Sequence, residues 1–228
     1  MNVVHPSLSW AAFQFANHQR RSIRTFSDAP IPEGEITALL EEATLAPSSG
    51  NLQPYQFHWV RNPDLKARVA AACNGQKAAK TATDIIVVVA SSEIARSSLV
   101  EQRAYIEAST AMPSASKQYH SKELSKFNRV LMIGGLPLWS PLLFLLSLFR
   151  PSASLLPLGG AGRRHWVARN AIFAAQTLML GAAAKGIDSC PMEGFSAAKI
   201  SRLLALPRGA VIPIIIALGY RADDARVE

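Results

Sequence analysis

A short polar loop carries the side chains with the clearest chemical purpose in this sequence. Residues 46–54 read APSSGNLQP and connect an amphipathic helical pattern to an aromatic strand pattern. A connection needs only one Gly or Pro, but this one adds hydroxyl and amide groups that suit the edge of a flat polar heterocycle. We call residues 47–53 the polar loop. Its members of interest are Pro47, Ser48, Ser49, Asn51 and Gln53.

A dense group of arginines precedes this loop. Residues 20–24 read RRSIR, and we call them the arginine segment. Arg presents a planar fork of N–H donors that matches phosphate oxygens, and a serine hydroxyl adds another donor. A solvated helix end is the alternative, and for the segment taken alone it is the better interpretation. The candidate anion ligands are Arg20, Arg21, Ser22 and Arg24.

Two further segments offer polar groups. Residues 191–194, which we call the PMEG turn, combine a carboxylate with a glycine that lets the backbone approach a ligand closely. Taken alone, such a string is weak evidence and also fits a plain loop between a helix and a strand. Gln76 and Lys77 precede an apolar strand pattern. The members of the PMEG turn are Pro191, Met192, Glu193 and Gly194.

In their order and approximate spacing, the arginine segment, the polar loop and the PMEG turn resemble the FMN-dependent nitroreductase family. The resemblance extends from Arg20 to Tyr220. It implies an α+β fold with a mixed central β-sheet flanked by helices, in an intertwined homodimer with two FMN sites at the interface. It also implies an oxidoreductase that passes hydride from NADH or NADPH through FMN to an electron-poor small molecule, such as a nitroaromatic or a quinone, by a ping-pong mechanism.

The resemblance assigns a role to each segment. Arg20, Arg21 and Ser22 would hold the FMN phosphate and ribityl chain. Arg24 would lie near flavin N1 and O2, where a cation stabilises the charge of the reduced ring. The polar loop would contact the flavin of the other subunit, and a backbone N–H of the PMEG turn would point at flavin N5. No catalytic side chain is implied, because the flavin carries the chemistry.

Two parts of the family pattern match less well. A polar or basic residue of the family often reaches the pyrimidine edge, and Gln76 and Lys77 are the candidates in an ambiguous register. The family also has Lys or Arg residues beyond the last strand that reach the phosphate. Here Arg221 and Arg226 are the candidates, and neither has the expected spacing.

Residues 110–162 form a Pro-rich insertion that contains an uncharged run, LPLWSPLLFLLSLF, at residues 136–149. This apolar segment is shorter than the roughly 20 residues that cross a bilayer, and Pro141 interrupts it. We expect short helices and loops, with the apolar segment covering the flavin face or the dimer seam. Trp139 and Phe144 would then lie nearest an aromatic acceptor, with core packing as an equal alternative. Contact with a membrane surface is the less favoured alternative.

Periodicity predicts a single domain, residues 1–228, in which helices and strands alternate. The run DIIVVVA at residues 84–90 indicates a central strand covered on both faces. Pro213 predicts an edge or a bulge in the last strand. Helices are expected at residues 7–20, between Pro32 and Pro47, at residues 64–73, 92–109 and 163–185, and after Ser196. Strands are expected at residues 55–59, 84–90 and 211–220.

Composition excludes several classes of protein. The chain has 228 residues, 49% of them hydrophobic, so it can bury a core. Its 24 Lys and Arg against 16 Asp and Glu give a net charge of +8, which suits anionic ligands. Nucleic acid is disfavoured, because no basic tail or recognition motif occurs. The histidines show no metal spacing, and the two cysteines with no signal-peptide pattern favour the cytoplasm.

Two alternatives to the nitroreductase reaction stay open. The same scaffold could carry other flavin chemistry, such as dehalogenation, flavin breakdown or oxidation of another small molecule. The chain could also be a non-catalytic FMN-binding protein that attaches to membranes through the apolar segment.

Overall fold

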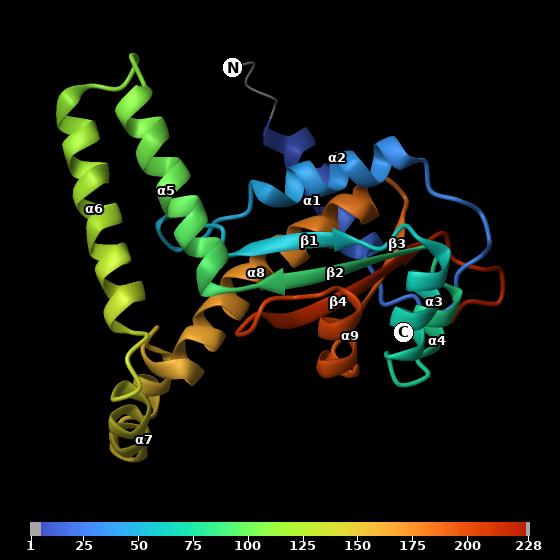
Figure 1. Ribbon diagram of the computed structural model, residues 1–228. Helices are drawn as coiled ribbons and strands as arrows, with labels where there is room; N and C mark the ends of the chain where they lie inside the picture. The colour runs from blue at the N-terminus through green and yellow to red at the C-terminus, as the bar shows by residue number, and fades with distance from the viewer. Residues whose placement is uncertain (1–5, 227–228) are drawn as a thin grey trace.

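The computed structural model describes residues 6–226, and the side chains of residues 9–153 and 155–226. A four-stranded sheet in the order β1-β2-β4-β3 lies between two layers of helices (Figure 1). The α+β class is therefore confirmed. Every strand pair is antiparallel. Outside the strands, an isolated parallel bridge joins Ser22 to Ser189. The strands are β1 Tyr55–Trp59, β2 Asp84–Ala90, β3 Asp188–Met192 and β4 Val211–Gly219.

The centre of the sheet is β2 paired with β4, as the apolar run predicted. Ile86 lies opposite Ile216, and both are fully buried. Side chains alternate along β2, so Ile86 packs into one helical layer and Ile85 into the other. The register shifts between Val88 and Ala90, opposite the part of β4 that contains Pro213. The bulge expected at this proline is confirmed.

Helices α1 Pro6–Gln19, α2 Glu33–Thr44 and α8 Gly159–Ala184 lie on one face of the sheet. The long helix α8 has 26 residues, which corresponds to ~39 Å at about 1.5 Å per residue. Its buried side includes five alanines, which allow close contact with the sheet. Gly186, with φ +71°, ends the helix as predicted.

Helices α3 Pro63–Ala71, α4 Lys77–Thr81 and α9 Ala197–Leu203 cover the other face. Asn62 caps α3, since its side chain accepts a hydrogen bond from the Leu65 N–H at 2.9 Å. The closest approach at this end of the sheet is between Phe26 and Gly219. A Cβ atom on Gly219 would lie 2.8 Å from Phe26 Cδ1, so only glycine fits this position of β4.

The proline-rich insertion is more regular than expected. Helix α5 Ser92–Ala108 and helix α6 Ser114–Ile133 form a long antiparallel pair, followed by α7 Trp139–Phe149 and the 3₁₀ turn η2 Pro151–Leu155. The sequence predicted short helices and loops, which is wrong for the 20-residue α6. Its buried seam includes only Leu124 and Leu131, two turns apart, so its helical period is hard to detect among polar residues.

Candidate functional site

The arginine segment runs along the open edge of β3, directly after α1. The Ile23 N–H donates to the Ser189 carbonyl oxygen at 3.1 Å, and the Ile23 side chain is fully buried. This anchor fixes the backbone, while Arg21 and Arg24 remain exposed and Arg20 is half-buried. The segment therefore presents its cationic groups on a rigid edge rather than on a frayed helix end.

The PMEG turn starts two residues later than expected, because Pro191 and Met192 belong to β3. Pro191 has no N–H, so it occupies a position whose backbone group points away from β4. Ser189, two residues earlier, accepts the bond from Ile23 on that same open edge. Glu193 directly follows β3, and if the strand's alternation continues through it, the Glu193 N–H points to this edge too. A ligand beside the arginine segment would meet it.

Gln76, at the start of α4, contacts the PMEG turn. Its Nε2 donates to the Gly194 carbonyl oxygen at 2.7 Å, which holds the PMEG turn in place. A Cβ atom on Gly194 would lie 3.2 Å from this Nε2 and would crowd the bond. Lys77, the first residue of α4, is exposed nearby. The structure thus brings together the arginine segment, Gln76 with Lys77, and the PMEG turn.

The polar loop is fixed elsewhere, around the 3₁₀ turn η1 Ser49–Asn51. The Ser49 N–H donates to Asn170 Oδ1 at 2.7 Å, and the Gln53 N–H donates to Ser48 Oγ at 2.9 Å. Gln102 donates to the Asn51 carbonyl oxygen. Asn51 and Gln53 have φ of 53° and 39°, a left-handed conformation that these bonds maintain. The loop is therefore held in a defined shape before any ligand binds.

Asn170 was not predicted as a site residue. It is buried on α8, and its Nδ2 donates to the Trp166 carbonyl oxygen at 2.8 Å. The one asparagine within an alanine-rich helix was the signal that could have identified it. Its role is to position the polar loop.

The polar loop and the arginine segment lie at opposite corners of the sheet. The loop leads into Tyr55, which pairs with Ala90 at one end of edge strand β1. The arginine segment contacts Ser189 on the other edge strand, opposite Leu218. Leu218 in turn pairs with Asp84, at the other end of β2. Side chains at these two corners cannot surround one small ligand within a single chain.

Trp139 and Phe144 lie on α7, which packs on the first turns of α8. The Gly160 N–H donates to Ser140 Oγ at 3.3 Å, so α7 adjoins the start of α8. The arginine segment follows α1, which contacts the end of α8 around Ala183. These two positions are ~35 Å apart along α8 at about 1.5 Å per residue. Within one chain, α7 therefore does not cover the arginine segment.

The two aromatic candidates differ in their surroundings. Phe144 is 66% exposed, whereas Trp139 is half-buried. The Trp139 Nε1 atom is buried with no described hydrogen-bond partner. Neither ring lies in the hydrophobic core of the sheet.

The Arg221 side chain forms an ion pair with Asp188 of the same chain. Its Nη2 and Nε donate to the two carboxylate oxygens of Asp188 at 2.6 and 2.9 Å. This hydrogen bond raises the pKa of the guanidinium further. Asp188 begins β3, so the pair lies beside the arginine segment and lines a 290 Å³ pocket with Gln19. Arg226 is exposed near the end of the described chain.

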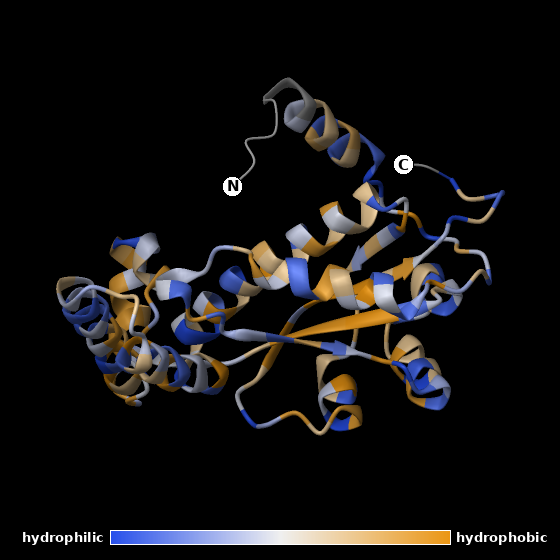
Figure 2. Cartoon of the chain, turned by 90° about the horizontal axis from the view of Figure 1, so that it is seen from above, coloured by the Kyte–Doolittle hydropathy of each residue, from blue (hydrophilic) through white to orange (hydrophobic). Residues whose placement is uncertain are grey.

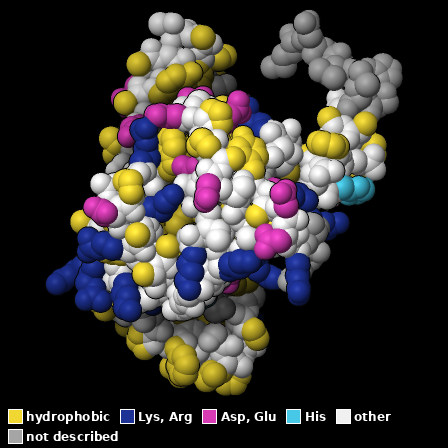
Figure 3. Space-filling view, turned by 90° about the vertical axis from the view of Figure 1, so that its right-hand side faces the viewer, with side chains coloured by type: hydrophobic (Ala, Val, Ile, Leu, Met, Phe, Trp, Pro, Cys, Tyr) yellow, Lys and Arg dark blue, Asp and Glu magenta, His cyan; other side chains and the backbone are white. Residues whose placement is uncertain are grey.

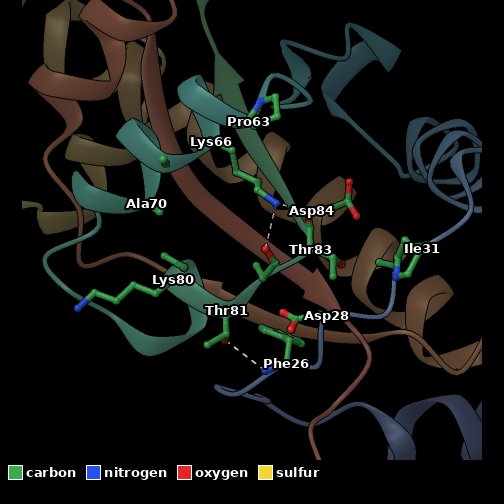
Figure 4. A pocket seen from close by; sticks show the side chains of 14 residues that line it. Phe26, Asp28, Ile31, Pro63, Lys66, Ala70, Lys80, Thr81, Thr83 and Asp84 are labelled. Atoms are coloured by element: carbon green, nitrogen blue, oxygen red, sulfur yellow. Dashed lines mark hydrogen bonds between the residues drawn. The ribbon is translucent and has the colours of Figure 1, made fainter.

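The largest of the described cavities contains none of the predicted ligands. It has a volume of 630 Å³ and lies between α3, α4 and the start of β2 (Figure 4). Lys66 Nζ donates to the Thr83 carbonyl oxygen at 2.7 Å, while Lys80 points away from the carboxylates of Asp28 and Asp84. The Lys66 ammonium group is thus occupied by a backbone carbonyl. The side chains that line the cavity therefore offer no clear group of hydrogen-bond donors to a ligand.

An antiparallel sheet between helical layers, with a cationic segment along the open edge of β3, defines an α+β protein with a candidate anion site at the sheet edge. The model of the nitroreductase family matches residues 18–220, and the chain belongs to this family. The resemblance inferred from the three segments is confirmed.

Named relatives cover almost the whole chain. A protein named NADH dehydrogenase from Thermus thermophilus is 28% identical over 206 residues, which are 90% of this chain and 85% of the relative. NAD(P)H nitroreductase MhqN from Bacillus subtilis is 26% identical over 95% of this chain and 92% of its own. In fold, the chain is similar to a nitroreductase in complex with FMN from Exiguobacterium sibiricum. That match has a TM-score of 0.71 at 24% identity and covers 92% of this chain and 89% of the other.

Proposed function

We propose that this chain is an FMN-dependent oxidoreductase that takes hydride from NADH or NADPH and reduces an electron-poor small molecule. The observation that carries the proposal is the cluster at the β3 edge, where the arginine segment, the Glu193 N–H and Gln76 face one open site. Family membership and the FMN complex of the Exiguobacterium neighbour support it. Nitroaromatics and quinones are the expected acceptors.

The residues at this edge fit FMN. Arg20, Arg21 and the Ser22 hydroxyl provide the donor set that a phosphate monoester requires. Arg24 adds positive charge further along the same edge, where a flavin ring acquires negative charge on reduction. The Glu193 N–H is a fixed donor beside them, and Gly194 leaves room for close approach. Bound FMN supplies two-electron redox chemistry between nicotinamide and acceptor.

The site is completed by a second copy of the chain. The polar loop contacts the middle of α8 at Asn170, whereas the arginine segment lies near the C-terminal end of this helix. If two α8 helices pack antiparallel about a two-fold axis, the polar loop of one copy comes close to the arginine segment of its partner. Ile172 and Phe173 are exposed on α8, at 39% and 54%, and provide apolar surface for this contact.

Helix α1 supports the same arrangement. It packs on α8 at the periphery of the molecule (Figure 2), and its large apolar side chains are exposed. Trp10 is 59% exposed, Phe13 and Phe15 are also exposed, and Ala16 is buried. Such a helix gains stability by lying on a partner. This geometry supports our proposal of an intertwined homodimer with two shared FMN sites.

The chain's own residues then bind and orient rather than react. The arginine segment fixes the cofactor, the Glu193 N–H orients it, and the polar loop of the partner closes one side. Nicotinamide donor and acceptor use the same slot in turn, which is the ping-pong order. In the dimer, α7 of one copy approaches the β3 edge of the other, so Trp139 and Phe144 remain our candidates for the acceptor pocket.

Cofactor choice tests this proposal. We expect tight binding of FMN and weak binding of FAD, because a phosphate monoester fits two arginines and an adenylate adds bulk at the same point. Flavin fluorescence titration measures both affinities. The variant Arg20→Ala, Arg21→Ala should lose FMN binding, while Lys122→Ala, Arg129→Ala on α6 should keep it. Equal affinity for FMN and FAD would contradict the proposed phosphate grip.

A further inference from the structure

A cavity near α7 is lined by four arginines that the proposed FMN site does not use. It has a volume of 180 Å³ and lies between the first turns of α5 and α8 and the loop that leads into β4. Glu93 is the one carboxylate in its lining. The arginines are Arg96, Arg163, Arg164 and Arg208.

This group of cations is not neutralised within the described part of the chain. No ion pair is described for any of the four, and the Arg163 Nε atom donates to the Gly159 carbonyl oxygen at 3.4 Å. The first turn of α8 also contains no acidic residue. Cations near helix N-termini are unfavourable, because both carry positive charge. An anion in the cavity would offset the repulsion between these arginines and the helix N-terminus. A phosphate group matches the paired N–H donors of a guanidinium group.

The apolar helix α7 adjoins this cavity. Gly160, which lines the cavity, donates to Ser140 in the first turn of α7, and Arg163 reaches the chain just before α7. A Cβ atom on Gly135 would lie 3.2 Å from Arg163 Nη1. The arginine cavity and the apolar helix are therefore direct neighbours.

The outer face of α7 is apolar and exposed. Leu143 is buried against the body, whereas Leu138, Phe144 and Phe149 are 71%, 66% and 86% exposed. No charged residue occurs between Leu136 and Phe149. The helix is the lowest part of the molecule in Figure 1, and Figure 3 shows apolar side chains at that height. Further exposed members of this face are Leu136, Leu142, Leu145, Leu146 and Leu148.

We propose that this surface binds an anionic phospholipid bilayer. The phosphate of a lipid headgroup occupies the arginine cavity. Leu142, Leu145 and Phe149 of α7 insert among the acyl chains, whereas Trp139 and Phe144 stay at the acceptor pocket. A phospholipid bilayer offers anions and an apolar surface side by side, which is the combination found here. No described helix is long and apolar enough to cross a membrane, so α7 would lie at the interface.

Vesicle flotation of the FMN-loaded protein tests this proposal. We expect binding to vesicles of phosphatidylcholine with phosphatidylglycerol and little binding to phosphatidylcholine alone. The variant Arg96→Gln, Arg164→Gln should bind roughly thirtyfold more weakly, since each basic residue near an anionic leaflet is worth about a factor of five. The variant Leu145→Ser, Phe149→Ser should lose at least roughly a hundredfold, because two large apolar groups no longer insert.

Matched controls separate this site from general surface charge and hydrophobicity. Lys122→Gln, Arg129→Gln on α6 and Val100→Ser, Tyr105→Ser on α5 change exposed residues of the same types, and both should bind as the unmodified protein does. The proposal is overturned if these controls lose as much binding as the site variants, or if the unmodified protein ignores anionic vesicles. It is also overturned if pyrophosphate raises the Tm through the arginines without vesicle binding, which would indicate a site for free phosphates. Conversion of the α7 variant from dimer to monomer would instead assign α7 to the subunit interface.

Discussion

Mixing two inactive variants tests the shared site directly. One chain carries Arg20→Ala and Arg21→Ala, which removes two charge-assisted bonds of about 1.5–3 kcal/mol each and weakens FMN binding by roughly two to four orders of magnitude. The other carries Ser49→Trp, an exposed position of the polar loop where an indole would block the partner's site. Neither change touches the core, so both chains should fold and retain almost no FMN.

The expected rescue follows from two-fold symmetry. Random exchange makes about half of the dimers mixed, and each mixed dimer has one intact site of two, so about one quarter of all sites should bind FMN. The assay is bound flavin per chain after exchange, with mixed dimers verified by pull-down through a tag on one chain. Mixing the double arginine variant with Arg24→Ala is the matched control, because both defects affect the same half of each site and no site is restored. Full subunit exchange without regained FMN would refute a site built from two chains.

Three other predictions concern particular side chains. Trp139→Ala, Phe144→Ala should change the ratio of kcat/KM between nitroaromatic and quinone acceptors while FMN binding stays intact; an unchanged ratio would remove α7 from the acceptor pocket. Gly219→Ala should destabilise the fold by about 1–3 kcal/mol in urea unfolding, because its Cβ would overlap a buried phenylalanine ring, whereas Gly34→Ala meets nothing within 4 Å and should be neutral. Burial raises the pKa of the Cys73 thiol to about 11, so native-state alkylation at pH 8 should be roughly a hundredfold slower than in urea. Because the pKa is raised, the thiol's contribution to the free energy of unfolding is complete below about pH 9 and declines between about pH 9 and 11. Equal alkylation rates in the native state and in urea would contradict the raised pKa.

The sequence predicted most elements wherever local pattern and packing agree. The β-branched run of β2 and the Pro213 bulge follow directly from side-chain chemistry. Strand β3 was missed because it has five residues, includes Pro191 and lies at an edge, where alternation of apolar and polar residues is weak. Helix α6 was missed for a related reason, since its apolar positions are too sparse to reveal their period.

The site illustrates another limit of sequence. The residue types of the arginine segment indicate an anion site before any fold is known. The bond from Gln76 to Gly194 and the anchor from Asn170 to the polar loop join residues 118 and 121 positions apart, and no local pattern encodes them. Arg221 was considered only as a phosphate ligand, because its pairing with Asp188 depends on β3 lying beside β4.

Anaerobic reduction of the FMN-loaded protein tests the central claim most directly. NADH or NADPH is added, and the visible flavin absorbance is followed before and after addition of a nitroaromatic or a quinone. The account predicts bleaching by the nicotinamide and recovery on addition of the acceptor, both dependent on the arginine segment. A protein that retains FMN but is reduced by neither nicotinamide would contradict the proposed oxidoreductase.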